Sequence, residues 1–117
     1  MNRDDAMTFE DYQRLAATTA MYPGRTAKAP ALYPALGLAG EAGEVCEQFK
    51  KALRDDGGAF DDRRRLALKK ELGDVLWYVA ALCDELDLTM EEVAAQNVAK
   101  LQDRKARGVI TGDGDDR

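Results

Sequence analysis

The sequence contains no histidine among its 117 residues. This absence excludes Ser-His-Asp and Cys-His nucleophilic catalysis, and it excludes any zinc site built on histidine. Cysteine is almost as scarce. Cys46 and Cys83 each fall in an apolar stripe of an expected helix, so we expect two buried free thiols and no disulfide. Any chemistry must therefore rest on carboxylates, amines, hydroxyls or a hard metal ion.

Long apolar runs and basic stripes are also missing. No apolar run approaches the roughly 18 residues that a membrane span needs, and the polar residues 1–5 do not resemble a signal peptide. The net charge of -5 and the lack of a basic stripe argue against a duplex nucleic-acid binder. We therefore expect a cytoplasmic protein with neither polymeric nucleic acid nor a membrane as its partner.

The composition is that of one folded domain, with 45% hydrophobic residues and no low-complexity tract. Residues 1–117 are therefore expected to form a single domain, with flexible tails at 1–7 and 108–117. A short helical chain buries only a modest fraction of its surface, and self-association often completes its core. This predicts a homodimer or homotetramer.

Capping signals predict where the first two helices begin. Thr8 followed by Asp11 resembles a capping box and, with apolar residues at helical spacing, predicts a helix over 8–20. Pro34 fits the first turn of a second helix because its missing N–H is not needed there. That helix is expected to end near residue 54, before two acidic residues and two glycines.

Two further helices follow. Asp61 is expected to cap a helix over 62–86, and Thr89 a helix that ends near residue 106. No segment has the pattern of a strand. The short connection between the second and third helices predicts an antiparallel hairpin, so the predicted fold is all-α, with four helices, a helical hairpin core and flanking helices. The third helix has the broadest apolar stripe: Leu68, Leu72, Val75, Leu76, Val79, Leu82, Cys83 and Leu86.

Three glycines recur every three residues in the second helix, at Gly37, Gly40 and Gly43. Inside a helix each costs about 1 kcal/mol relative to alanine. A compensating close approach is therefore expected, by a neighbouring helix of this chain or of a second subunit.

Two pairs of carboxylates stand three residues apart, Glu41 with Glu44 and Glu71 with Asp74, so each pair shares a helix face. At ~1.5 Å per residue, Glu44 and Glu71 both lie about 14 Å from the expected hairpin connection, and Glu41 and Asp74 match each other's level in the same way. Both pairs are also displaced to the same rotational side of their apolar stripes, so they point either into a shared groove or away from it. Only Asp74 has a basic residue three or four positions away, Lys70. An ordinary solvated acidic face is the alternative interpretation.

If the carboxylates converge, they raise one another's pKa values unless a cation compensates. An all-oxygen cluster suits Mg²⁺, with Mn²⁺ as a substitute. Such an ion usually takes further ligands from phosphates, which favours phosphate ester chemistry.

Other polar side chains are candidates for binding a phosphorylated substrate. Asn97, Lys100 and Arg104 share one face of the fourth helix and offer an amide and two cations, although a solvated face would look the same. Tyr78 lies on the carboxylate side of the third helix, where its hydroxyl could meet a phosphate or sugar; a core tyrosine is the alternative. Trp77 lies off the apolar stripe and is expected to pack against another helix or subunit.

Two segments resemble the signature of MazG-like nucleotide pyrophosphohydrolases. They read Gly40-Glu41-Ala42-Gly43-Glu44 and Glu71-Leu72-Gly73-Asp74-Val75-Leu76-Trp77-Tyr78. The family's pattern is a pair of glutamates, two residues, a glutamate, and a later E-x-x-D. The resemblance extends from about Tyr12 to the end of the sequence.

This resemblance implies the all-α NTP pyrophosphatase fold, Mg²⁺ dependence, and hydrolysis of an NTP or dNTP to its monophosphate and pyrophosphate. Removal of non-canonical nucleotides is one role that it allows. By position, Glu41, Glu44, Glu71 and Asp74 would be metal ligands, and Glu41 or Glu44 would activate the water. Gly40 stands where many relatives have the first glutamate, so the number of metal ions and the general base stay open. Two other functions also stay open: phosphoribosyl-ATP pyrophosphohydrolase, from the same superfamily, and a non-catalytic module that binds a nucleotide or metal.

Overall fold

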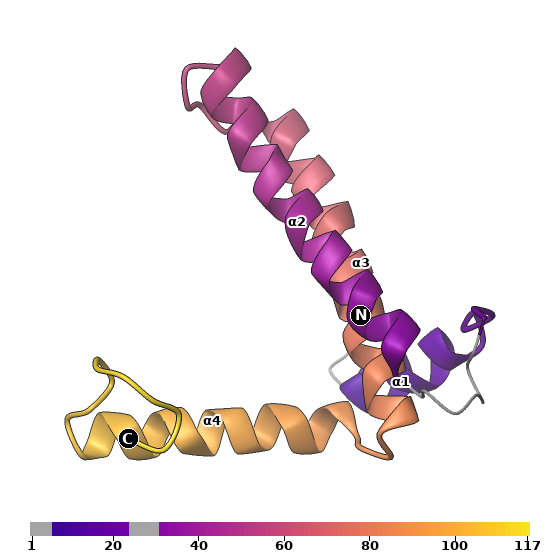
Figure 1. The fold of residues 1–117 in the computed structure, drawn as a ribbon, viewed down its shortest axis with the longest axis vertical. Coiled ribbons are helices and arrows are strands. Elements are labelled where there is room, and N and C mark those ends of the chain that lie inside the picture. Colours follow the sequence, from indigo (N-terminus) through magenta and orange to yellow (C-terminus); the bar gives the residue numbers. More distant parts are fainter. Residues whose placement is uncertain (1–5, 24–30) are drawn as a thin grey trace.

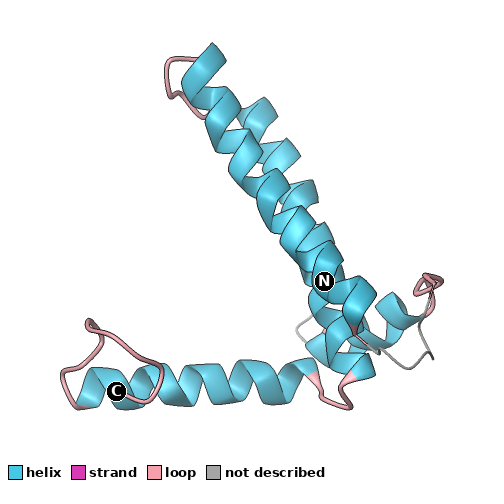
Figure 2. Cartoon of the chain, viewed as in Figure 1, coloured by secondary structure: helices cyan, strands magenta, loops and turns pink. Residues whose placement is uncertain are grey.

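The computed structural model describes residues 6–23 and 31–117, and this part of the chain is helical without strands. Its helices are α1 (Phe9–Ala17), α2 (Leu32–Asp55), α3 (Asp62–Glu85) and α4 (Met90–Ala106). Helices α2 and α3 form an antiparallel hairpin, α1 packs near the open end of that hairpin, and α4 leaves as a separate arm (Figures 1 and 2). The predicted fold class is confirmed. None of the described helices is long and apolar enough to cross a membrane.

The predicted capping residues are all in place. The Thr8 hydroxyl accepts a bond from the backbone N–H of Asp11 at 3.1 Å, and the Asp11 carboxylate accepts one from the N–H of Thr8 at 3.1 Å. The side chains of Asp61 and Thr89 likewise each accept a backbone N–H in the first turn of α3 and α4. These bonds satisfy donors that a helix start otherwise leaves without partners.

Helix α1 is shorter than expected, because it ends at Ala17 and not at residue 20. The hydroxyls of Thr18 and Thr19 bond back to carbonyls three residues earlier, at 2.6 and 3.0 Å. Such local side-chain bonds compete with continued helix. The spacing of apolar residues, on which the prediction of this helix rested, does not indicate whether such side-chain bonds form.

The start of α2 lacks a side-chain cap. Ala31 precedes the helix in a left-handed conformation (φ 68°), and its N–H donates to the Glu85 carboxylate at the end of α3. Pro34 lies buried in the first turn, as predicted. The long-range bond from Ala31 thus joins the start of α2 to the end of its hairpin partner.

The connection between α2 and α3 is a tight turn formed by the two acidic residues and two glycines at 55–58. Gly57 and Gly58 both have positive φ, at 60° and 86°, a conformation that glycine adopts without steric cost. The buried Arg64 guanidinium pairs with the Asp56 carboxylate at 2.5 Å and fixes the turn to α3. The predicted end of the second helix is therefore confirmed to within one residue.

The buried core is small and lies where α1, α3 and the start of α4 meet. Five of the ten buried side chains among the described residues are alanines, so little apolar volume is enclosed. The core cluster consists of Ala16, Ala80, Cys83 and Met90, with Tyr12, Leu76, Trp77 and Val79 packed against it.

Much of the predicted apolar surface stays uncovered by this chain. In the α3 stripe, Leu72 and Leu86 are 51% and 55% exposed. Cys83 is buried as expected, but the expectation for Cys46 was wrong, because this thiol is exposed. The reason is the course of α4, which has no Cα atom within 8 Å of α2 and leaves the hairpin's outer surface open.

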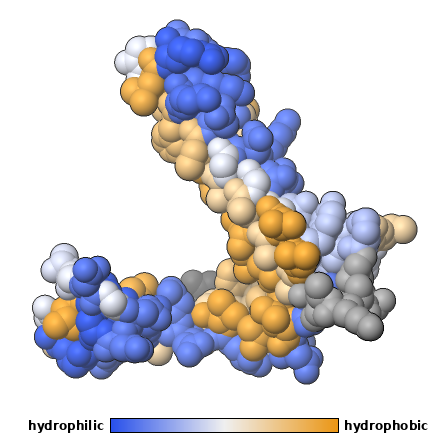
Figure 3. Space-filling model, viewed as in Figure 1, coloured by the Kyte–Doolittle hydropathy of each residue, from blue (hydrophilic) through white to orange (hydrophobic). Residues whose placement is uncertain are grey.

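The open shape can be compared with that of a compact monomer. The accessible surface is 8712 Å², whereas a compact protein of 12.9 kDa exposes about 6300 Å². The radius of gyration is 17.3 Å, against about 13.4 Å for a compact domain of this length. Apolar surface gathers on the hairpin's lower half and at the corner where α4 leaves (Figure 3).

Candidate functional site

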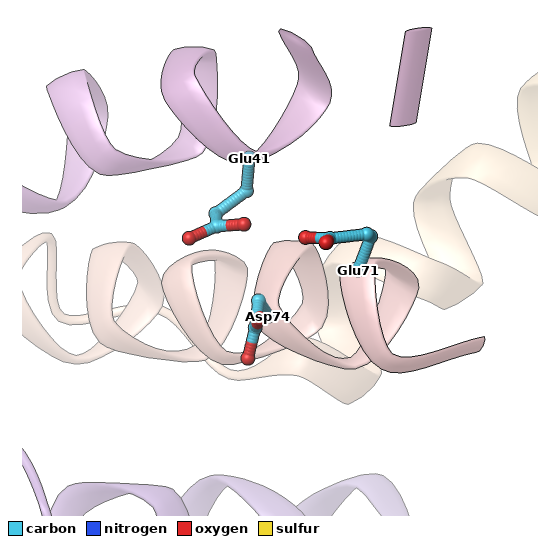
Figure 4. A group of neighbouring side chains, drawn as sticks. All are labelled: Glu41, Glu71 and Asp74. Carbon is cyan, nitrogen blue, oxygen red and sulfur yellow. The ribbon is translucent and has the colours of Figure 1, made fainter. Parts of the chain in front are cut away.

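Three carboxylates meet across the hairpin, Glu41 from α2 and Glu71 and Asp74 from α3 (Figure 4). One oxygen of each lies within 4.8 Å of the others. Glu71 and Asp74 share a face because they are three residues apart, and the antiparallel pairing brings Glu41 to their level. Of the two arrangements that the sequence allowed, the structure has the convergent one for these residues.

Glu44 is not part of this group within the described residues, and its side chain is exposed. It lies one turn further along α2 than Glu41, and its negative charge contributes to the raised pKa of Glu41. The structure therefore brings together three of the four expected metal ligands and leaves the fourth beside them, facing solvent.

The electrostatics of the group favour a bound cation. Burial raises the pKa of Glu41, and the negative charge of Asp74 raises it further, followed by a hydrogen bond with Glu71. Two carboxyl groups can share such a bond only if one holds a proton, and a divalent cation can take the place of that proton. Three carboxylate donors also leave room for the waters and phosphate oxygens that Mg²⁺ keeps in its octahedral shell. The donor set thus fits Mg²⁺ or Mn²⁺.

Tyr78 lies next to this group. Its ring packs directly on the backbone of Gly37, where an added Cβ would lie 2.2 Å from Tyr78 Cε1. Burial raises the pKa of Tyr78, and neighbouring Tyr33 and Glu41 raise it further. The close approach predicted for the glycines of α2 is confirmed at Gly37, but Gly40 and Gly43 face no described atom within 4 Å.

Trp77 packs into the core edge, as predicted. Its indole N–H donates to the Thr19 hydroxyl at 2.8 Å, and its ring meets those of Tyr22 and Tyr78 edge-on. Tyr22 in turn stacks on Tyr33 with ring centroids 5.0 Å apart. These contacts hold the ring of Tyr78, which lies next to the carboxylates, in a fixed orientation.

The three polar residues of α4 lie elsewhere. Asn97, Lys100 and Arg104 line one cavity of about 660 Å³, which confirms that they share a face, and Asp115 lies in the same cavity. None of the clustered carboxylates lines it. Because α4 diverges from the hairpin, this chain alone does not bring these residues to the carboxylate group (Figure 1).

Comparison with known proteins gives a family. The model of the MazG nucleotide pyrophosphohydrolase domain matches residues 33–109, which is more than half of the chain. The Gene 37 protein of Mycobacterium phage L5 is 46% identical over 114 residues, covering 95% of this chain and 100% of that protein. The chain belongs to the MazG nucleotide pyrophosphohydrolase family. No solved structure matches it significantly.

The MazG match contains both carboxylate segments and the polar face of α4, but it begins after α1. Helix α1 packs on α3, and the pKa of its Tyr12 is raised by burial and then by the negative charge of Asp74. Sequence reasoning assigned no site role to Tyr12. The position of Tyr12 among the apolar residues of α1 indicates only which face of the helix it occupies. The packing of α1 on α3 determines which residues lie near that face.

A second feature that sequence reasoning missed is a hollow on α3 beside the acidic group. It has a volume of about 620 Å³ and is lined by Glu71, Lys70 and Arg63 among others. Lys70 therefore offers a cation next to one of the clustered carboxylates. Its place directly before Glu71 was the available signal, but its orientation depends on the hairpin.

Proposed function

We propose that this MazG-family protein hydrolyses a nucleoside or deoxynucleoside triphosphate to the monophosphate and pyrophosphate, with Mg²⁺ held by Glu41, Glu71 and Asp74. The observation that supports this most directly is the convergence of these carboxylates inside the segment that matches the family. Bound Mg²⁺ would supply charge neutralisation and a more acidic water. Mn²⁺ is the expected substitute.

The reaction needs a group that accepts a proton. A water oxygen forms a bond to the α-phosphorus, the bond to the bridging α–β oxygen breaks, and pyrophosphate leaves with that oxygen. The water's proton passes to a carboxylate. Glu41 is our first choice as the base, because it belongs to the convergent group, where a carboxylate oxygen that does not bind the metal could take up the proton. Glu44, one turn away and exposed, is the alternative base.

The substrate's outer phosphates need cations, and Lys70 is one candidate within the chain. Asn97, Lys100 and Arg104 are the others, and a second copy of the chain would have to bring them to the hairpin. The surface supports such a homodimer or homotetramer. About 2400 Å² per chain is exposed beyond the compact expectation, and obligate interfaces bury about 2000–5000 Å² over both partners.

The reaction is tested by incubating the purified full chain with a panel of NTPs and dNTPs in Mg²⁺ and measuring monophosphate and pyrophosphate separately. Release of orthophosphate and a diphosphate would refute attack at the α-phosphorus. Cleavage of phosphoribosyl-ATP alone would assign the alternative enzyme. Saturable nucleotide binding without turnover would assign the non-catalytic module.

The metal site is tested by Glu71→Gln, which keeps the shape of the side chain and removes its charge. We expect a loss of activity beyond about 100-fold, because even outer-shell partners of a metal typically contribute about 10–100-fold. Glu47→Gln is the matched control, since Glu47 pairs only with Lys50 among described residues, at 2.7 Å. Glu44→Gln decides whether the exposed fourth carboxylate takes part.

The assembly is tested separately, by light scattering on the full chain across a range of concentrations. A mass that stays at 12.9 kDa throughout would refute the second copy.

A further inference from the structure

The segment 108–117, expected to be flexible, folds back along α4 in the structure (Figure 1); its flexibility stays a prediction. Gly112 and Gly114 have positive φ values of 118° and 84°, and between them they turn the chain back towards α4. The Arg117 guanidinium then donates to the carbonyls of Ile110 and Gly114 and closes the turn. We call residues 109–117 the tail.

One side chain of the tail pairs with the two cations of the predicted substrate-binding face. The Asp115 carboxylate accepts bonds from Lys100 Nζ at 2.9 Å and from Arg104 Nη2 at 3.1 Å. Arg104 Nη2 also donates to the backbone carbonyl of Asp115. Both cations lower the pKa of Asp115, Lys100 first, so the residue is a carboxylate at neutral pH. A carboxylate of the chain thus lies where a phosphate oxygen would bind.

Arg104 has donor capacity that the tail does not use. The residue is only 5% exposed, and its Nε is buried without a hydrogen-bond partner among the described residues. Nε and Nη2 form one edge of the guanidinium plane, and a phosphate can accept from both donors side by side. Asp115 bonds only to Nη2, so the arginine is incompletely satisfied with the tail in place.

The surroundings also suit a larger anion than a carboxylate. The cavity of about 660 Å³ is bordered by Asn97 and Arg107 as well as by the two cations. Arg107 is already paired with Asp103 at 2.8 Å, so Lys100 and Arg104 are the cations that depend on Asp115. If Asp115 leaves, a buried arginine loses its counter-charge, and another anion must replace it.

We propose that Asp115 of the tail is a built-in competitor at the phosphate-binding face of α4, and that a phosphate or pyrophosphate group displaces it from Lys100 and Arg104. Binding at this site and release of the tail are then one coupled equilibrium. The site can bind phosphates whatever the catalytic activity is. The further statement that these phosphates belong to a nucleotide substrate rests on the proposed function.

The test uses the full chain in EDTA, so that no metal ion holds phosphate at the carboxylate group, with inorganic pyrophosphate as the probe in calorimetry. The variant is Asp115→Asn, and the matched control is Asp113→Asn, which makes the same charge change in the tail outside the cavity. A tail that is closed about 80–90% of the time weakens binding about five- to tenfold, so we expect Asp115→Asn to tighten binding by that factor. Asp113→Asn should bind like the unmodified chain.

A second variant opens the tail without removing a charge. Gly114→Ala places a side chain at φ 84°, where alanine is strained, although no described atom lies within 4 Å of the new Cβ. It should also bind pyrophosphate more tightly. Equal or weaker binding by both Asp115→Asn and Gly114→Ala, relative to Asp113→Asn, would overturn the proposal and make Asp115 a structural brace.

Release of the tail is measured directly from the amide dynamics of Gly112 and Gly114 by ¹⁵N relaxation. We expect both amides to gain mobility on saturation with pyrophosphate. Amides that stay equally ordered would overturn displacement. Arg104→Lys, which keeps the charge but loses the fork of donors, should bind pyrophosphate more weakly than the unmodified chain.

The source of the phosphate is distinguished by a non-hydrolysable nucleoside triphosphate analogue in the same assay. Tighter binding of the analogue than of pyrophosphate identifies a nucleotide, and equal binding identifies the free anion. These measurements involve neither metal nor turnover. If the chain has no hydrolytic activity but Asp115→Asn binds pyrophosphate more tightly, the proposed function is refuted and the role of Asp115 is supported. If the chain hydrolyses nucleotides but Asp115→Asn does not bind pyrophosphate more tightly, the proposed function is supported and the role of Asp115 is refuted.

Discussion

Replacing Gly37 with alanine tests the packing that positions Tyr78 beside the acidic group. The new Cβ would lie 2.2 Å from Tyr78 Cε1, so reaching an ordinary contact of 3.4 Å requires the ring to withdraw by about 1.2 Å. Overpacking of this kind costs about 1–3 kcal/mol. The gain in helix propensity from glycine to alanine offsets about 1 kcal/mol of that cost.

Gly43→Ala is the matched control, because Gly43 lies on the same helix and faces no described atom within 4 Å. Both variants receive the same propensity gain, so their difference isolates the steric cost of about 1–3 kcal/mol. For a domain of this size, that difference corresponds to roughly 4–12 °C in Tm. Circular dichroism melts at one fixed protein concentration measure it, since association would otherwise shift the Tm.

Tyr78→Ala provides the internal check. With the ring removed, Gly37→Ala should become as favourable as Gly43→Ala, and the double-mutant cycle should return the steric term. If Gly37→Ala and Gly43→Ala shifted the Tm by the same amount with Tyr78 present, the ring would not rest on Gly37, and the described position of Tyr78 beside the carboxylates would be wrong.

Three further predictions concern the site and the helix starts. Lys70→Gln should raise KM severalfold with little change in kcat if this cation holds outer phosphates; an unchanged KM in steady-state pyrophosphate release would exclude it. Thr89→Ala should lower the free energy of unfolding by about 1 kcal/mol, because α4 loses its cap, and a urea titration measures this. The pKa of Asp11 is lowered mainly by the Thr8 N–H. The Asp11 carboxylate therefore stabilises the fold at pH values above its unfolded-state pKa of about 3.9. This stabilisation is lost as the pH falls through the lower folded-state pKa. The difference in urea midpoint between Asp11→Asn and the unmodified chain should accordingly shrink below about pH 4; a difference that grew would contradict the capping role.

Local signals predicted the helices well because they act within a few residues. The caps at Thr8, Asp61 and Thr89 satisfy their own first turns, and none needs a distant partner. Where a helix boundary depended on something else, prediction was weaker. The early end of α1 comes from threonine hydroxyls, and the start of α2 relies on the bond between Ala31 and Glu85, 54 residues apart.

Side-chain exposure was harder to predict than helix position. A stripe that recurs every three or four residues indicates an apolar face, but it does not say whether this chain covers that face. Cys46 and Leu72 both belong to such stripes and are exposed, because α4 diverges from the hairpin. The glycines of α2 illustrate the same limit, since only Gly37 has a close neighbour among the described residues.

The sequence by itself determined the class of the fold, the approximate positions of its helices, the family, and the set of acidic residues from which the candidate metal site is drawn. These follow from short-range spacing and from a motif, which the order of residues contains in full. Only the tertiary structure decided which carboxylates converge, that Lys70 borders a hollow with Glu71, and that Asp115 pairs with Lys100 and Arg104. Each of these depends on how helices and the tail are oriented in space, and the packing between distant segments fixes that orientation.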